Sequence, residues 1–219
     1  MLQDILEYLP RPLRALAIRF NSKPIGSVED LAEFVRTRSA FIAQTSLYGY
    51  LKTRMGTRFP EFFEDDVFSQ SIQAASVKLF VSCLGDLTVY TVATSGKDGR
   101  MSADEAAALA RHCFTEALRI ALAELDADHL PPDASDLFDL RTRNTQWANA
   151  AIGANAFAGS EGDLIRYAPV IDEFKELDRE IVTNSIRFRW LDVRDQVQRR
   201  LDGDAVSRRW REQSASSSG

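Results

Sequence analysis

The sequence has 219 residues, the size of one ordinary domain or of two small ones. Hydrophobic residues make up 45% of it and charged residues 27%, and these values exclude a largely disordered chain. The formal net charge of −5 argues against a nucleic-acid-binding protein, because such proteins usually carry an excess of Lys and Arg.

The first predicted element is an amphipathic, locally basic segment over residues 1–25. Its leucines recur at steps of three and four residues, as on one face of a helix, and Pro10 bends or breaks that helix. Arg14 and Arg19 belong to a basic cluster that follows this proline. Such a segment suits an anionic membrane surface or the groove of a partner, and the alternative is that its leucines pack on the rest of the protein.

Two long helices are predicted next. Ser27, with Asp30 three residues later, is typical of a capped helix start, and helical spacing of apolar residues continues to about Arg54. A second helix over residues 65–94 carries the most regular apolar stripe of the sequence. Charged residues within it argue against a membrane-spanning helix, so we expect a cytoplasmic protein.

The middle of the chain is expected to hold a long helix and then a shorter one. Ser102 and Glu105 form a capping-box pattern at the start of an Ala-rich helix that reaches about residue 125. After a proline-containing connector, a shorter helix is predicted over residues 136–152. Small residues over 153–163 predict a loop.

The last long helix is expected to begin near Ala168 or Pro169 and to carry two apolar stripes. The first consists of Tyr167, Val170, Phe174, Leu177, Ile181, Asn184, Phe188 and Leu191. The second consists of Ile186, Trp190, Val193, Val197 and Leu201. We expect both stripes to be buried, each against a different neighbour.

The predicted fold class is therefore all-α, a single-domain helical bundle of five or six helices. The bundle domain is expected over residues 26–212. The small polar residues 213–219 predict a disordered tail.

Familiar catalytic patterns are missing from the sequence. Phosphate-binding glycine loops are absent, and the string nearest to a serine-hydrolase elbow, around Ser160, falls in a predicted loop. His112 and His129 are the only histidines, and no second His-bearing motif completes a metal site. Cys83 and Cys113 are expected to be buried free thiols, although the sequence leaves a bridge between them open. We therefore predict no catalytic residue, no metal and no cofactor.

A candidate interaction surface is predicted where aromatic and basic residues interleave. Tyr48, Tyr50, Arg54 and Arg58 are its members, because aromatic residues and Arg are typical of protein interfaces. The basic residues of the N-terminal segment are added to it. The alternative is that the rings lie in the core with the basic side chains running along its edge.

The stretches from Ser27 to Arg38 and from Tyr48 to Arg58 resemble a family of small, uncharacterised bacterial helical proteins. The resemblance covers about residues 27–66, and members of that family often carry the label "esterase". It implies hydrolysis of small esters as an activity, but it implies no catalytic residues in this chain.

The sequence leads to a hypothesis of function with two alternatives. We expect a non-enzymatic helical interaction or assembly factor with a protein partner, without nucleic acid, and with peripheral contact to the inner membrane surface left open. One alternative is a hydrolase of small esters with an unrecognised site. The other is a binder of small molecules or lipids between helices.

Overall fold

The computed structural model describes residues 23–216 apart from 124, 126, 154 and 155, and it leaves out the side chains of residues 60–63. The predicted amphipathic segment, with Arg14 and Arg19, therefore lies almost wholly outside the described residues. Over the described part, the chain is an all-α bundle of eight α-helices without a strand, so the fold class is confirmed. The predicted count of five or six helices is too low.

The helices differ widely in length, and the three longest form the body of the bundle. The α-helices are α3 (Val28–Met55), α4 (Asp66–Ser95), α5 (Ala103–Leu122), α6 (Ala134–Asn144), α7 (Trp147–Ala151), α8 (Ala158–Tyr167), α9 (Asp172–Arg200) and α10 (Gly203–Ser216). Short 3-10 helices are η1 (Gly56–Glu64), η2 (Lys97–Gly99) and η3 (Ala127–His129).

Capping side chains start three of the helices close to where the sequence predicts them. The Ser27 hydroxyl accepts a hydrogen bond from the Asp30 N–H at 3.0 Å, and Asp65 caps α4 in the same way. Ser102 and Glu105 form the reciprocal capping box of α5. These side chains satisfy N–H groups that the first turn of a helix leaves without a partner.

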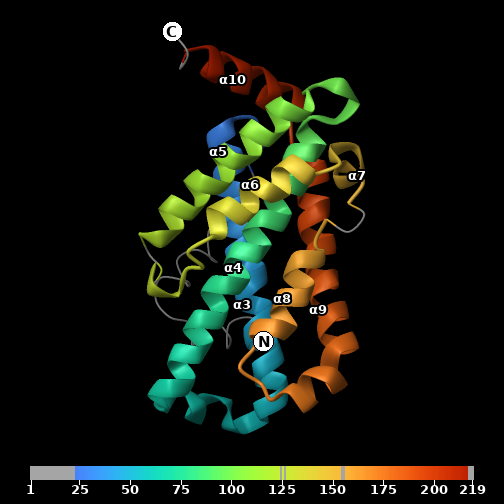
Figure 1. Ribbon diagram of the computed structural model, residues 1–219. Coiled ribbons are helices and arrows are strands. Elements are labelled where there is room, and N and C mark those ends of the chain that lie inside the picture. Colours follow the sequence, from blue (N-terminus) through green and yellow to red (C-terminus); the bar gives the residue numbers. More distant parts are fainter. Residues whose placement is uncertain (1–22, 124, 126, 154–155, 217–219) are drawn as a thin grey trace.

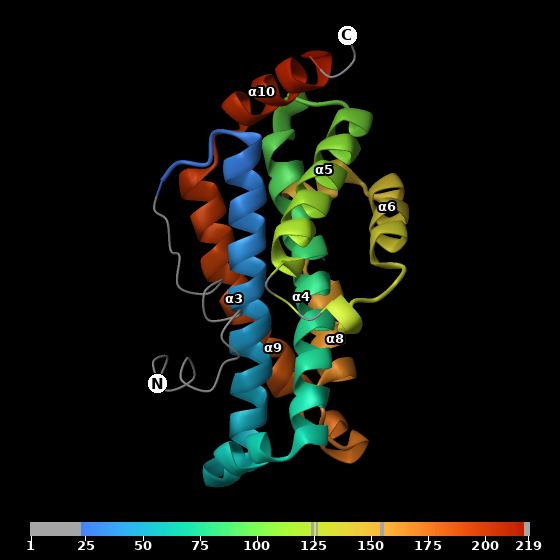
Figure 2. The same ribbon diagram turned by 90° about the vertical axis from the view of Figure 1, so that its left-hand side faces the viewer.

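Helices α3 and α4 run antiparallel through the centre, joined at one end by η1 (Figures 1 and 2). Helix α5 packs on one side of this pair, α8 and α9 pack on another, and α10 lies across the end opposite to η1. The core consists of apolar side chains from all the long helices, and its largest fully buried side chain is Trp190 of α9.

Helix α4 is the one helix in the described part of the chain that is long and apolar enough to cross a membrane. Inside the bundle, 72% of its most apolar window is buried. A core helix of a bundle has the same composition, because it is surrounded by other helices on most sides. The property is therefore weak evidence for a membrane span.

Short helices account for the differences from the predicted elements. The predicted helix over 136–152 is divided into α6 and α7, and α10 continues to Ser216, so residues 213–216 are helical instead of a disordered tail. The predicted loop over 153–163 is wrong in its second half, where α8 begins.

The start of α8 depends on a side chain from another helix. The buried carboxylate of Asp86, on α4, accepts a hydrogen bond from the Ser160 N–H at 2.7 Å. This contact supplies what a capping residue next to the helix would supply, an acceptor and a negative charge at the helix N-terminus. A sequence pattern cannot reveal this helix start, because Asp86 is far away along the chain.

Candidate interaction surface on helix α9

The structure buries the aromatic half of the predicted interaction surface. Tyr48 is fully buried, with its ring edge-on to Phe59 at 6.2 Å, and Tyr50 is also buried. Burial raises the pKa of Tyr50 to about 12, and Asp178 beside it acts in the same direction. Neither ring is available to a partner, so the alternative that places them in the core applies to these two residues.

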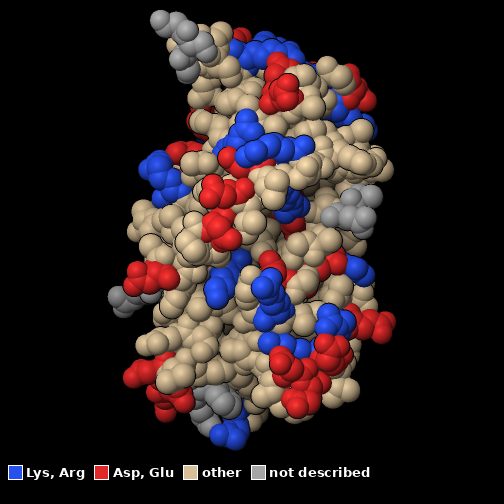
Figure 3. Space-filling model, viewed as in Figure 1, with Lys and Arg blue, Asp and Glu red and all other residues tan. Residues whose placement is uncertain are grey.

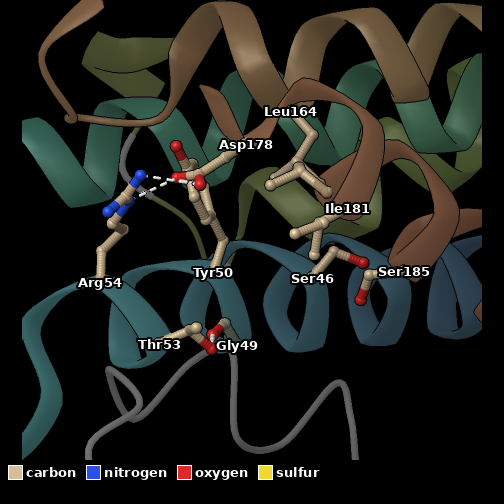
Figure 4. A pocket seen from close by; sticks show the side chains of 10 residues that line it. Ser46, Gly49, Tyr50, Thr53, Arg54, Leu164, Asp178, Ile181 and Ser185 are labelled. Atoms are coloured by element: carbon tan, nitrogen blue, oxygen red, sulfur yellow. Dashed lines mark hydrogen bonds and ion pairs between the residues drawn. The ribbon is translucent and has the colours of Figure 1, made fainter. Parts of the chain in front are cut away.

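Arg54 holds α3 against the beginning of α9. Its guanidinium forms a bidentate pair with Asp178, with one contact at 2.7 Å, and lies 4.2 Å from the centre of the Phe174 ring. Figure 4 shows Arg54, Tyr50 and Asp178 together at one end of a pocket of about 170 Å³ between α3, α8 and α9. Arg58 is exposed. The role of these two arginines in binding a partner stays a prediction.

Helix α9 has apolar residues on two faces, and only one of them meets the core. The buried face consists of Val182, Ile186, Trp190, Val193 and Val197. All of these except Val182 belong to the predicted second stripe. The first stripe, expected to be buried as well, lies on the opposite face of α9 and is exposed. That expectation is wrong for the residues of α9 itself.

We call the exposed stripe the α9 seam. Its members are Phe174, Leu177, Ile181, Asn184, Phe188 and Leu191. Leu177, Ile181 and Phe188 are 74%, 72% and 72% exposed. Single exposed apolar residues are normal in proteins, but a row at alternating steps of three and four residues is the pattern of a coiled-coil contact face. Burying one such side chain contributes about 1.5–3 kcal/mol, so water is an unfavourable neighbour for this row.

The seam lies at the outside of the bundle, and its borders are fixed by contacts to the neighbouring helices. On one border, Arg187 pairs with Glu161 of α8 at 2.8 Å. On the other border, Asp178 is held by Arg54 of α3. In Figure 1, α9 runs along the right-hand edge of the molecule. These contacts hold the buried face inward and leave the seam facing away from the core.

The net charge changes sign along α9, although Lys175 and Arg179 lie in its first part and Asp192 and Asp195 in its second. Its first part carries the acidic residues Asp172, Glu173, Glu176, Asp178 and Glu180. Its second part carries the basic residues Arg187, Arg189, Arg194, Arg199 and Arg200. Figure 3 shows acidic side chains gathered over the lower end of α9, where its N-terminal part lies, with basic side chains beside them.

A second polar group of residues lies inside the bundle around Asp86. Its carboxylate contacts Arg141 of α6 at 2.7 Å as well as the Ser160 N–H. A Cβ on Gly159 would come within 2.9 Å of the Asp86 carboxylate, so a glycine permits this approach. Burial raises the pKa of Asp86, while Arg141 and Ser160 act in the opposite direction. The cluster joins α4, α6 and α8.

The serine of the string nearest to a hydrolase elbow belongs to this structural cluster. The Ser160 hydroxyl is buried, donates to the Phe157 carbonyl and accepts from the Trp190 ring N–H at 3.1 Å. A nucleophilic serine needs a base within hydrogen-bond reach, and the His112 ring lies beside that of Trp210 instead, with the ring centres 5.4 Å apart. Among the described residues, no group of three or more His, Cys, Asp or Glu side chains is placed to hold a metal ion.

A larger pocket, of about 380 Å³, lies between α4, α6 and α8. Phe114 and Phe138 line it, and their rings are stacked 4.0 Å apart. Lys78 and Arg166 also line it, each with its charged group 5.3 Å from the Tyr167 ring centre. Asp133 and Asp163 line it as well, and Asp163 accepts a hydrogen bond from the Ser82 hydroxyl. An apolar wall beside Lys78 and Arg166 can hold a small molecule with an acidic group.

Both cysteines are buried free thiols, as the sequence predicts. Burial raises the pKa of each thiol well above its ordinary value. Because the thiolate is the reactive form, these positions suit packing rather than chemistry. With the cysteines assigned to packing, the α9 seam is the most pronounced exposed apolar surface among the described residues.

The sequence contains the signal for the seam, but not its orientation. The six seam positions can be recognised in the sequence by their heptad spacing. A helix with two apolar faces must bury at least one face, but the spacing does not indicate which face that is. Compared with models of protein families, with curated proteins and with solved structures, the chain matches none. The resemblance of residues 27–66 to esterase-labelled proteins therefore stays a prediction.

Proposed function

We propose that this protein is a non-enzymatic helical interaction or assembly factor, and that it binds a helix of a protein partner along the α9 seam. The observation that carries this proposal is the exposure of Leu177, Ile181 and Phe188 at coiled-coil spacing on one face of a helix. A helix whose own apolar residues repeat with the same spacing buries that row and excludes water from it.

Charge beside the seam favours a protein helix over a membrane as the occupant. Glu173 and Glu180 lie on one border of the seam, and both are exposed. Arg187 and Arg194 lie on the same border. Anionic headgroups would attract these arginines but repel the two acids, whereas a helix with opposite charges at matching positions would pair with both. Membrane contact through the N-terminal segment, residues 1–25, is a separate proposal, since it concerns a different segment.

Site-specific photo-crosslinking tests this function. With a photoreactive phenylalanine analogue in place of Phe188, illumination of cells that express the protein is expected to yield a covalent adduct to another polypeptide chain. The same analogue at Arg119, an exposed residue of α5, serves as the matched control and is expected to yield none. Equal adducts from both positions, or no adduct from Phe188, would contradict the proposal.

A second candidate function is the binding of a small acidic molecule in the pocket between α4, α6 and α8. Lys78 and Arg166, beside the stacked Phe114 and Phe138 rings, support it. Native mass spectrometry of the purified protein is expected to show an added mass that is lost in Lys78→Glu. A spectrum of the bare chain in both proteins would count against this candidate.

A further inference from the structure

The α9 seam and its charged borders specify what kind of helix fits them. Because acidic residues predominate in the first part of α9 and basic residues in the second, the best partner has the same two blocks in reverse order. We infer that the partner is a second copy of this chain, whose α9 docks antiparallel to the first about a twofold axis. This inference rests on the proposed function, since it names the occupant of the same surface.

The apolar residues of the seam match themselves when the helix is reversed. With the axis between Ile181 and Asn184, Phe174 lies opposite the partner's Leu191, and Leu177 lies opposite the partner's Phe188. Each large ring then meets a leucine, and every contact occurs twice, as twofold symmetry requires. The seam spans about 18 residues, or about 27 Å of helix, so we expect an interface at the small end of specific contacts.

Charges on the seam border distinguish the antiparallel from the parallel arrangement. Residues 173, 180, 187 and 194 recur every seven residues along the border that faces α8. In the antiparallel pair, Glu180 lies opposite the partner's Arg187, which is 59% exposed despite its contact with Glu161. In a parallel pair, Glu173 would face the partner's Asp178, so like charges would meet there, and Arg187 facing the partner's Asp192 would offset this repulsion only in part. The antiparallel pair has no such like-charge contact, because Glu173 faces the partner's Arg194. Charged residues beside a coiled-coil seam set orientation in this way.

Asn184 lies near the centre of the proposed antiparallel pair. It is the one polar member of the seam, and in the antiparallel pair the two copies of Asn184 lie next to the twofold axis. In this register each Asn184 lies opposite the partner's Ile181. Sliding either helix by one heptad would place Asn184 opposite the partner's Phe174 or Phe188 instead of Ile181.

The proposed contact between two α9 helices joins two chains and no more. Helix α9 lies at an edge of the bundle, so two α9 helices can meet while their bundles lie on opposite sides (Figures 1 and 2). An isologous contact uses the same surface of both chains and leaves no second copy of it for further growth. We therefore expect a dimer instead of a filament.

Charge-swapped variants of the full chain test the inference by sedimentation velocity. The wild type is expected to sediment as a dimer at high micromolar concentration. Glu180→Arg and Arg187→Glu are each expected to sediment as monomers, since like charges then meet at both symmetric positions. An equimolar mixture of the two variants is expected to dimerise again, because opposite charges then face each other at both positions. Glu116→Arg and Arg119→Glu, on exposed α5, are the controls and should leave the dimer intact.

Arg187→Glu loses the contact to Glu161, so it could fail to dimerise because it misfolds. A variant that carries both changes on one chain is the control for this effect. This double variant is expected to dimerise by itself, with the helical circular-dichroism spectrum of the wild type. A monomeric wild type, single variants that remain dimeric, or a mixture and double variant that both stay monomeric would overturn the inference. If the wild type is monomeric while Phe188 still crosslinks to a different protein, the proposed function stands and the second copy is ruled out. An adduct within one chain, from Phe188 to residues 1–22, would instead identify that segment as the occupant.

Discussion

Asp86 is an ionisable residue without contact to solvent, and its environment explains why it is tolerated there. Arg141 provides a positive charge, and the Ser160 N–H provides a hydrogen bond. A buried charge is costly unless it is paired, and removing one partner usually costs more than the pair itself contributes. The pair therefore fixes how α6 and α8 dock on α4.

Replacing Arg141 by alanine is expected to lower the free energy of unfolding near neutral pH by about 2 kcal/mol, below the roughly 3–5 kcal/mol of a fully buried pair, because Arg141 is partly exposed. Burial already raises the pKa of Asp86, and the loss of Arg141 raises it further. The folded variant then binds a proton at a higher pH than the unfolded chain does, so its deficit shrinks as the pH falls toward the ordinary Asp range. Urea unfolding at several pH values measures this.

The control for this prediction is the pair Asp86→Asn and Arg141→Ala on one chain. Without the carboxylate, no buried charge is left uncompensated, so the double variant should recover part of the lost stability and lose the pH dependence. An Arg141→Ala deficit that is the same at every pH would show that Asp86 does not carry it.

The burial of Tyr48 shows the limit of a prediction that is made from residue types alone. Aromatic and basic residues that alternate in a sequence are typical both of interfaces and of a core with basic side chains at its edge. Composition cannot decide between them, because the choice depends on which side of α3 meets α4. The structure buries Tyr48 and Tyr50 and leaves Arg58 exposed.

Helix α10 is attached to α5 through the capping box that starts α5. Glu105 accepts a hydrogen bond from the Ser102 N–H and also pairs with Arg211 of α10 at 2.7 Å. Arg211 first, and then the Ser102 N–H, lower the pKa of Glu105 to about 2. One carboxylate thus serves both as a helix cap and as an anchor for the last helix.

A pH-dependent difference in melting temperature is expected between the wild type and Glu105→Gln. Because the pKa of Glu105 is depressed in the folded state, its stabilising effect is present above its ordinary value of 4.5 and is lost as the pH falls toward about 2. Thermal unfolding should show the largest difference at neutral pH and a shrinking one under acid. A difference that does not change with pH would contradict this role.

The long helices could be predicted from the sequence because each carries its own signals. Capping residues and a regular apolar stripe define α3, α4 and α5, and the structure confirms them. Helix α8 could not be predicted, since its start depends on Asp86 of α4. The seam of α9 was recognisable as apolar, but two apolar faces compete, and only the docking of α9 on α3 and α8 decides which is buried.

In the molecule as a whole, the two apolar faces of α9 have different roles. Trp190 and its neighbours bury one face of α9 and keep the bundle together. The seam contributes nothing to that core, yet it exposes side chains that water disfavours. A surface of this kind is stable in solution when another chain covers it, and this expectation connects the fold to the proposed function.

Sedimentation of Leu177→Glu, with Leu137→Glu as its matched control, tests this expectation most directly. Both leucines are exposed, at 74% and 56%, so neither change should alter the free energy of unfolding of the single chain by more than about 0.5 kcal/mol. We predict that Leu177→Glu sediments as a stable monomer, whereas Leu137→Glu, on α6, associates like the wild type. If Leu177→Glu and the wild type sediment identically, the seam is not an association surface, and the account is contradicted.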